Sequence, residues 1–305
     1  MASSGILESS LTASAQSRGQ RATVRTYLAF VKPHIDVTFM LVAATGSVLA
    51  AGHAATTPLW RIVGIVVAVG LLSAGAECWT NLLDRNMDAL MPRTARRALP
   101  SGQVSLRNAS ALGGLLTASG LAIAVTLGPL PVLFLGLALV NNVVIYSALT
   151  KRATPWSIVL GSLAGPLTLW AGYTTVAVPV SAPALLLGVM VAAWVPVHIW
   201  AIATLYRDDY ATAGVPMAPV VWSRMALSVG SAGSALLMGT VATVGLVLLG
   251  GTAATVAGAV VGLASAAVAV AAALLPWRPR VAGPLVHWVT AYLLAVLLLA
   301  IILAA

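Results

Sequence analysis

Charged residues are scarce in this chain. Only 8% of its 305 residues are Asp, Glu, Lys or Arg, whereas soluble domains carry roughly 25%. So little polar material excludes a soluble globular domain of this length, because its surface could not be covered. Together with 60% hydrophobic residues and a mean hydropathy of +1.00, the scarcity predicts a polytopic membrane protein.

Cysteine and acidic residues are also few. Cys78 is the single cysteine, which excludes an intramolecular disulfide, and we expect it to be a buried structural thiol. Seven acidic residues stand against sixteen Lys and Arg, for a formal charge of +9. Basic residues gather in the cytoplasmic loops of membrane proteins, so this charge does not predict a nucleic-acid partner.

Long apolar runs make up most of the remaining sequence. A helix needs about 20 apolar residues to cross a bilayer, and continuous rather than alternating runs favour helices over a β-barrel. The sequence therefore predicts an all-α bundle of nine transmembrane helices. The nine runs are 35–52, 61–82, 108–127, 130–149, 156–178, 182–204, 224–249, 252–275 and 283–304.

The distribution of basic residues predicts how the bundle is oriented. Lys and Arg precede the first run and follow the even-numbered ones, and only Arg61 lies on the opposite side. This alternation places the N-terminus in the cytoplasm and the C-terminus outside. Residues 1–24 lack the apolar core of a secretory signal. We expect them to form a disordered cytoplasmic tail before a membrane domain at 25–305, with a transit peptide as the alternative.

One stretch holds many of the few charged residues. Residues 80–97, TNLLDRNMDALMPRTARR, hold two Asp and four Arg directly after an apolar run. If the second helix continues past the membrane surface, Glu77, Asn81, Asp84 and Asp88 lie on one face, because their spacings are four, three and four. Carboxylates at this spacing repel one another unless a cation lies between them. We predict a Mg²⁺ site, since Mg²⁺ takes oxygen ligands from one or two carboxylates and from substrate phosphates.

Arginines complete this predicted site. Arg93, Arg96 and Arg97 follow the acidic residues closely, and guanidinium groups suit phosphate oxygens. Metal-binding carboxylates beside arginines predict a diphosphate site at the membrane surface. The alternative, equally open from spacing alone, is that the acids pair with neighbouring arginines on a solvated loop.

A second polar cluster follows the sixth run and reads YRDDYATAGVPM from Tyr206. Asp208 and Asp209 could hold a second metal, and the faces of Tyr206 and Tyr210 could stabilise a cation. The alternative is ordinary solvation of a helix end.

Polar residues inside predicted spans are functional candidates. Tyr146 and His198 qualify, while Asn141 and Asn142 are expected to form interhelical hydrogen bonds. The basic pair Lys151 and Arg152 follows the fourth run, where its alternative role is simply to orient the chain.

Three stretches carry a family resemblance. They read DRNMDALMPRTARRALPSG (84–102), YSALTKRATPWSIVLGSLAGPLTLWAGY (146–173) and HIWAIATLYRDDYATAGVPMAPVV (198–221). From about Tyr27 onward the chain resembles the UbiA superfamily of intramembrane prenyltransferases, and within it the protoheme IX farnesyltransferase family. It departs from that family's pattern at Asn86, where Asp is usual, and at Ala98, where Pro is usual.

The resemblance implies a reaction. A farnesyl group would pass from farnesyl diphosphate to a vinyl group of protoheme IX, with Mg²⁺ as cofactor and heme O as product. It also implies a bacterial cytoplasmic membrane, or less readily a mitochondrial inner membrane, and partners such as heme A synthase or terminal oxidase assembly factors. Alternatives are a related enzyme acting on an aromatic or quinone precursor, and a secondary transporter of an anionic lipid or solute. A transporter would place its polar groups near the bilayer midplane, whereas these acids cluster at one surface.

The resemblance also implies roles for individual residues. The expected metal ligands are Asp84, Asp88 and Asn81. The expected catalytic residues are Asp84, Asp88, Arg93, Arg97 and Lys151. The expected substrate-binding residues are Asn81, Arg96, Tyr146, Arg152, His198, Tyr206, Asp208, Asp209 and Tyr210. Among these, His198 is the candidate heme contact, because imidazole suits iron as an axial ligand.

Overall fold

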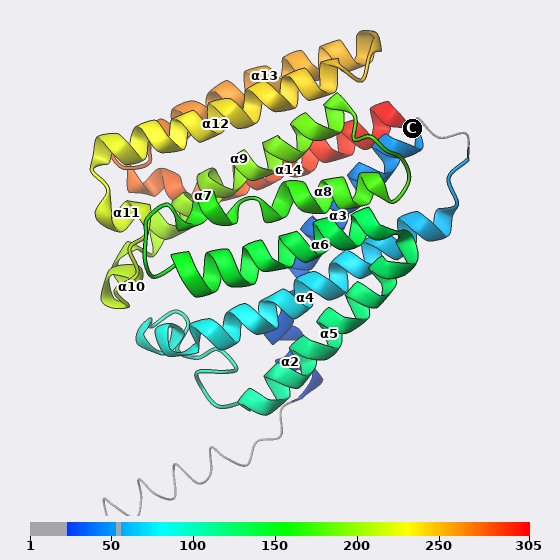
Figure 1. Ribbon diagram of the computed structural model, residues 1–305. Helices are drawn as coiled ribbons and strands as arrows, with labels where there is room; N and C mark the ends of the chain where they lie inside the picture. The colour runs from blue at the N-terminus through cyan, green and yellow to red at the C-terminus, as the bar shows by residue number, and fades with distance from the viewer. Residues whose placement is uncertain (1–22, 53–55) are drawn as a thin grey trace, which may run out of the picture.

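The structure is a computed structural model that describes residues 23–52 and 56–305. Every regular element in these ranges is helical, and the long helices run side by side as a bundle (Figure 1). The prediction of an all-α fold is confirmed. The predicted tail at 1–24 lies almost wholly outside the described residues. The elements are α2 (Val24–Val31), α3 (Pro33–Ala51), α4 (Leu59–Leu90), α5 (Leu106–Leu127), α6 (Pro129–Leu139), η1 (Val140–Thr150), α7 (Ser157–Gly161), α8 (Ala164–Thr174), α9 (Ala182–Leu205), α10 (Arg207–Thr212), α11 (Ala218–Val221), α12 (Arg224–Val247), α13 (Gly251–Leu274), η2 (Pro279–Val281) and α14 (Ala282–Ala304).

Seven helices in the described ranges are long and apolar enough to cross a membrane. They are Leu59–Leu90, Leu106–Leu127, Pro129–Thr150, Ala182–Leu205, Arg224–Val247, Gly251–Leu274 and Pro279–Ala304. The bent pair formed by α2 and α3 gives an eighth candidate. The chain is therefore an integral, multi-pass membrane protein, and each of these helices coincides with a predicted run to within a few residues, apart from α4, which continues eight residues further.

The predicted run 156–178 differs, because it forms two short helices, α7 and α8, rather than one. Asn141 of η1 satisfies the backbone at the break: its Nδ2 donates to the carbonyl of Leu160 at 2.8 Å, and its Oδ1 accepts from the amide of Ala164 at 3.1 Å. The expectation of an interhelical role for Asn141 is confirmed. Hydropathy alone does not reveal the break, since both sides of it are equally apolar.

The predicted run 130–149 begins as α6 and passes into a π-helix, η1. Its wider turns are visible at the end, where the amide of Lys151 donates to the carbonyl of Tyr146, five residues earlier, at 2.8 Å. Segments of this kind are rare and frequently lie at functional sites. Here the π-helix ends directly before the basic pair Lys151 and Arg152.

Close packing between helices depends on small residues. A Cβ at Gly46 of α3 would lie 2.0 Å from the carbonyl oxygen of Leu169 in α8, and one at Gly172 would lie 2.1 Å from that of Ala43. The two backbones are therefore in contact, as expected where lipid removes the hydrophobic drive for helix association. The Ser47 hydroxyl adds a hydrogen bond to the Gly172 carbonyl at 3.0 Å.

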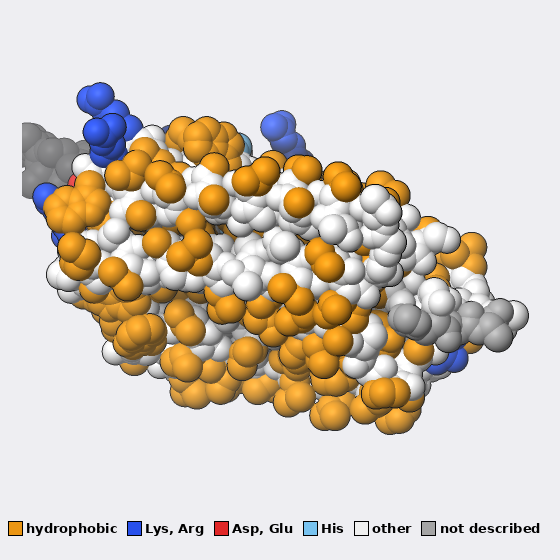
Figure 2. Space-filling view, turned by 90° about the horizontal axis from the view of Figure 1, so that it is seen from above, with side chains coloured by type: hydrophobic (Ala, Val, Ile, Leu, Met, Phe, Trp, Pro, Cys, Tyr) orange, Lys and Arg blue, Asp and Glu red, His pale blue; other side chains and the backbone are white. Residues whose placement is uncertain are grey.

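Three connections lie together at one end of the bundle, which we call the basic end. They are the first loop (91–105), the second loop (151–156) and the third loop (206–223), which includes α10 and α11 (Figure 1). The turns α5–α6, α8–α9 and α12–α13 lie at the opposite end. Figure 2 shows a face dominated by hydrophobic side chains, on which Lys and Arg are few and lie mainly at one end.

Arg61 is the exception at the opposite end, and the structure explains it. Its Nε donates to the carbonyl of Thr175 and its Nη2 to that of Leu127, both at 2.7 Å. These carbonyls close the ends of α8 and α5. The guanidinium thus satisfies acceptors that a helix C-terminus leaves without intrahelical partners, and it holds three helix ends together.

We expect Arg61→Met to lower the free energy of unfolding by about 2–3 kcal/mol, because two charge-assisted hydrogen bonds are lost. Arg61→Lys should retain only part of the free energy of unfolding that Arg61→Met loses, since an ammonium cannot donate in two fixed directions as a guanidinium does. Thermal unfolding of the purified protein in detergent measures both. An unchanged melting temperature for Arg61→Met would contradict this role.

Candidate functional site

The predicted acidic stripe lies on one helix. α4 continues to Leu90, well past the end of its apolar run at residue 82, so the expected extension is confirmed. Asn81, Asp84 and Asp88 are all buried, with 7%, 6% and 2% of their surfaces exposed. A buried carboxylate is costly unless it is paired, so the partners of these side chains define the site.

Asp84 is paired with the second loop. Its Oδ2 bonds to Nζ of Lys151, and its Oδ1 lies 3.4 Å from Nη2 of Arg152. Nζ of Lys151 also lies 5.5 Å from the ring centroid of Tyr146. Burial acts to lower the pKa of Lys151, but Tyr146 and Asp84 outweigh it and raise that pKa above its ordinary value. Lys151 is therefore a cation at neutral pH.

Asp88 is paired with the first loop. Nη1 of Arg97 lies 2.9 and 3.1 Å from its two carboxylate oxygens. The Thr94 hydroxyl donates to the backbone carbonyl of Asp88 at 2.8 Å, so the loop folds back onto the end of α4. Pairing between acids and arginines, the alternative reading of the sequence, thus occurs at Asp88, but the carboxylate is buried rather than solvated.

A cavity of about 210 Å³ lies beside Asp88, between α2 and the first loop. Its charged lining includes Arg96, Arg97 and Lys32. Lys32 was not predicted as a site residue. Its Nζ lies 2.5 Å from Oε2 of Glu77 and 3.5 Å from Oδ1 of Asn81. The available signal was a lysine directly before Pro33 at the start of an apolar run.

The structure brings part of the second acidic cluster to the first. Nε of Arg93 lies 3.8 Å from Oδ2 of Asp209, and its guanidinium carbon lies 4.3 Å from the ring centroid of Tyr206. Two predicted site regions more than a hundred residues apart therefore meet at the basic end. Asp208 is exposed, and Tyr210 is buried in the hydrophobic core.

His198 lies apart from these ion pairs. It precedes Tyr206 by eight residues on α9, which is about 12 Å along the helix axis. Its Nδ1 lies 3.2 Å from the hydroxyl oxygen of Thr290 on α14. The predicted heme contact is therefore inside the bundle, between α9 and α14.

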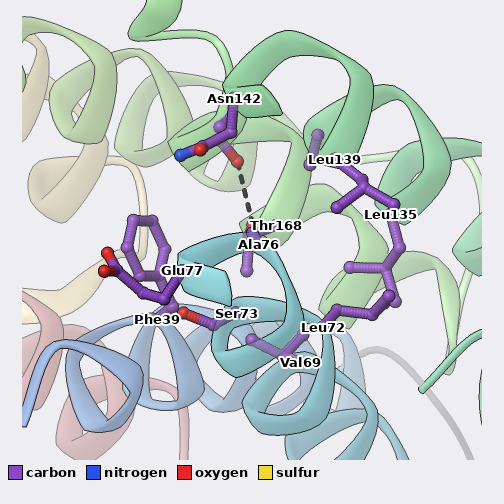
Figure 3. A pocket seen from close by; sticks show the side chains of 12 residues that line it. Phe39, Val69, Leu72, Ser73, Ala76, Glu77, Leu135, Leu139, Asn142 and Thr168 are labelled. Carbon is purple, nitrogen blue, oxygen red and sulfur yellow. Dashed lines mark hydrogen bonds between the residues drawn. The ribbon is translucent and has the colours of Figure 1, made fainter. Parts of the chain in front are cut away.

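A narrow apolar cavity of about 70 Å³ lies between α3, α4, α6, η1 and α8. Figure 3 shows Glu77 and Asn142 with their polar groups at one side, and Leu72, Leu135 and Leu139 at the other. Glu77 lines this cavity and also pairs with Lys32, so the cavity adjoins the charged site. Sequence reasoning missed its aliphatic lining, because these residues resemble every other residue of the spans.

The described residues contain no group of three or more His, Cys, Asp or Glu side chains arranged to hold a metal by themselves. Asp84 and Asp88 supply two carboxylates, one turn apart. Mg²⁺ commonly binds one or two carboxylates together with substrate phosphates. The donor set therefore fits a metal that arrives with a diphosphate better than one bound by the protein alone.

Comparison with known proteins identifies the class. Residues 39–282 match the UbiA prenyltransferase family, so the chain belongs to this family of membrane-embedded prenyltransferases. Its relatives narrow the class further. A protoheme IX farnesyltransferase from Thermoplasma acidophilum is 40% identical over 192 residues, covering 63% of this chain and 67% of the relative. Protoheme IX farnesyltransferase 1 from Picrophilus torridus is 38% identical over 216 residues, covering 70% and 72%.

Solved structures share the fold at low identity. A digeranylgeranylglyceryl phosphate synthase superposes with a TM-score of 0.73 at 16% identity, covering 92% of this chain and 98% of that one. A UbiA homolog from Archaeoglobus fulgidus, bound to GPP and Mg²⁺, gives 0.68 at 17% identity, covering 90% and 99%.

We expect Asp84→Asn to destabilise the protein by about 3 kcal/mol, because Lys151 is left buried without its partner. The double variant Asp84→Asn/Lys151→Met should lose less free energy of unfolding than the sum of the losses in the two single variants. The reason is that neither charge is left buried without its partner. Chemical unfolding in detergent of the two single variants and the double variant measures the coupling. Additive losses would show that the pair does not hold the second loop to α4.

Proposed function

We propose that this protein transfers the farnesyl group of farnesyl diphosphate to a vinyl group of protoheme IX, giving heme O and releasing diphosphate. The observation that carries the proposal is the pair of buried carboxylates, Asp84 and Asp88, which pair with basic residues of the first and second loops and lie near an apolar cavity. Relatives of this chain at 38–40% identity bear the name protoheme IX farnesyltransferase.

The basic side chains bind and stabilise the leaving diphosphate. Lys151 and Arg152 both contact the carboxylate of Asp84, and Arg97 pairs with Asp88. Arg93 and Arg96 extend the donor set along the first loop. Donors held in place before the reaction stabilise charge as it develops on the departing oxygen. A dissociating allylic diphosphate is such a case, so these residues act mainly by electrostatic stabilisation.

Mg²⁺ is held by Asp84 and Asp88, with the amide oxygen of Asn81 as a further ligand. When bound, Mg²⁺ supplies positive charge that neutralises the diphosphate. Binding of Mg²⁺ and GPP by the Archaeoglobus fulgidus homolog, which shares the fold, supports this assignment. The cations now paired with Asp84 and Asp88 are then available to phosphate oxygens.

The apolar cavity beside Glu77 holds the start of the farnesyl chain, and the remainder extends between helices toward lipid. Tyr146, next to Lys151, and Tyr206, under Arg93, present aromatic faces that stabilise an allylic cation. Burial of the site keeps water away until the vinyl group has reacted. Asp209 holds Arg93 in place, and Asp208 and Tyr210 belong to the same substrate-binding loop.

The same proposal includes the membrane topology. The broken pair α7 and α8 counts as one span and the bent pair α2 and α3 as another, which gives nine. The N-terminus is cytoplasmic and the C-terminus outside, so the basic end faces the cytoplasm of a bacterial cell. Residues 25–305 form the prenyltransferase domain after a cytoplasmic tail. Heme A synthase or a terminal oxidase assembly factor receives the product.

We expect purified protein given protoheme, farnesyl diphosphate and Mg²⁺ to produce heme O, detected by mass spectrometry. Asp88→Ala and Arg97→Ala should lower kcat by about 10²–10³, because each removes a group that stabilises the departing diphosphate. Arg85→Ala and Asn86→Ala are matched controls, since both side chains are exposed on the same stretch and pair with each other.

Two other outcomes are informative. Prenylation of a quinone precursor, without heme O, would keep the fold and the diphosphate site but reject the acceptor. Full activity of folded Asp88→Ala would reject the assignment of α4 as the diphosphate helix.

A further inference from the structure

We infer that Lys32, at the junction of α2 and α3, is a further diphosphate-binding residue, and that Glu77 is its partner until the substrate binds. The inference rests on the proposed function in taking a prenyl diphosphate as the ligand. It goes beyond that function by assigning a cation from the α2–α3 junction to the phosphate oxygens, and by giving the carboxylate of Glu77 a role in the site.

The backbone of Lys32 has an uncommon conformation. Its φ of 50° and ψ of 63° are left-handed, and among the described residues it is the only one other than glycine with a positive φ. Residues with a side chain adopt this conformation where the surrounding structure holds them in it. Pro33 begins α3 directly afterwards. The junction brings the end of α2 against α4, where Phe30 and Asn81 are joined by a hydrogen bond.

This hydrogen bond orients the amide of Asn81. A carbonyl oxygen only accepts hydrogen bonds, so the 3.1 Å bond to the Phe30 carbonyl must come from Nδ2 of Asn81. Oδ1 of Asn81, the atom proposed to bind Mg²⁺, is then left for other partners, and Nζ of Lys32 lies 3.5 Å from it. The junction of α2 and α3 thus places an ammonium group next to a proposed metal ligand.

The ammonium group of Lys32 has one more donor than the protein uses. It carries three protons, and within the described part of the chain it contacts two acceptors, Oε2 of Glu77 at 2.5 Å and Oδ1 of Asn81 at 3.5 Å. The Lys32 and Glu77 side chains are only 23% and 20% exposed, so little solvent competes for the third proton. That proton is available to an acceptor on a bound ligand.

The cavity beside Lys32 favours an anionic ligand. Three cations line it, Lys32, Arg96 and Arg97, together with a single carboxylate, that of Asp88. Arg97 is paired with Asp88, whereas Arg96 has no ion-pair partner among the described residues. One water needs roughly 10–15 Å³ of such space, so a cavity of about 210 Å³ accepts a much larger ligand. The proposed metal ligands Asn81 and Asp88 both line it.

The pair of Lys32 and Glu77 joins two cavities. Lys32 lines the one with the cations, and Glu77 lines the apolar one between α3, α4, α6, η1 and α8 (Figure 3). A prenyl diphosphate has an anionic head that fits the first and an apolar tail that fits the second. The C–O bond between head and tail then lies beside the ion pair. When it breaks, its electron pair leaves with the diphosphate, and the ammonium of Lys32 stabilises the added negative charge.

Titration calorimetry with inorganic diphosphate and Mg²⁺ tests the inference without any transfer reaction. In purified protein, Lys32→Met should weaken diphosphate binding about tenfold, because a charge-assisted hydrogen bond is lost, and Lys32→Arg should keep most of the affinity. Glu77→Gln should instead tighten binding about threefold, because glutamine still accepts from Lys32 but no longer competes as an anion. Arg25→Met is the matched control, since it removes an exposed cation of α2 that does not line the cavity.

Opposite effects of Lys32→Met and Glu77→Gln on affinity support the inference, because a purely structural ion pair predicts a loss from either change. Weaker binding in Glu77→Gln overturns it, and this variant decides even if Lys32→Met does not fold. A loss in Arg25→Met as large as that in Lys32→Met also overturns it, as does a wild type that makes heme O without binding diphosphate. Opposite effects in a protein that makes no heme O support the role of Lys32 and reject the proposed acceptor instead.

Discussion

Two carboxylates buried on a single helix require cations from other parts of the chain, and this requirement organises the basic end of the bundle. Asp84 is matched by Lys151 and Arg152 of the second loop, and Asp88 by Arg97 of the first. Removing one member of such a pair leaves a stranded charge, which costs more than the pair contributes. The loops are thereby fixed over the end of α4, where Arg93 then reaches the third loop through Asp209.

The same ion pairs suit a site in which the carboxylates and the basic side chains exchange each other for the metal and the diphosphate. In the proposed reaction the diphosphate and its metal bring both signs of charge to the site together. Carboxylates that lose a protein cation gain the metal, and cations that lose a carboxylate gain phosphate oxygens. Each buried charge keeps a partner throughout, so desolvation is not repeated when substrate binds.

The placement of the acidic residues at this end was predictable because it depends on helical periodicity and on residue type. The spacing of Asn81, Asp84 and Asp88 placed them on one face, and the structure has them buried together on α4. Their partners were less predictable. Lys151 lies 67 residues from Asp84 in the chain, and nothing local indicates which of the nearby cations meets which acid. That choice is made by packing of the whole bundle.

The positions of the membrane-spanning helices were predicted, but their breaks and their departures from α-helical geometry were not. Hydropathy indicates the length and apolarity of a span, but it does not indicate the break between α7 and α8. Asn141 stabilises this break through hydrogen bonds to two backbone groups. Hydropathy also does not indicate the π-helical hydrogen-bond pattern of η1. The pairing of Lys32 with Glu77 was missed for a related reason, since it joins a lysine that precedes one apolar run to a glutamate within another.

The π-helix η1 has a consequence for where Lys151 lies. A π-helix advances less around its axis per residue than an α-helix, because each of its turns holds more residues. The angular position of Lys151 is therefore set by a segment that begins eleven residues earlier, at Val140. Deleting one residue within that segment would change the angular position of Lys151 relative to α4. The length of this segment thus helps to set the ion pair between Lys151 and Asp84.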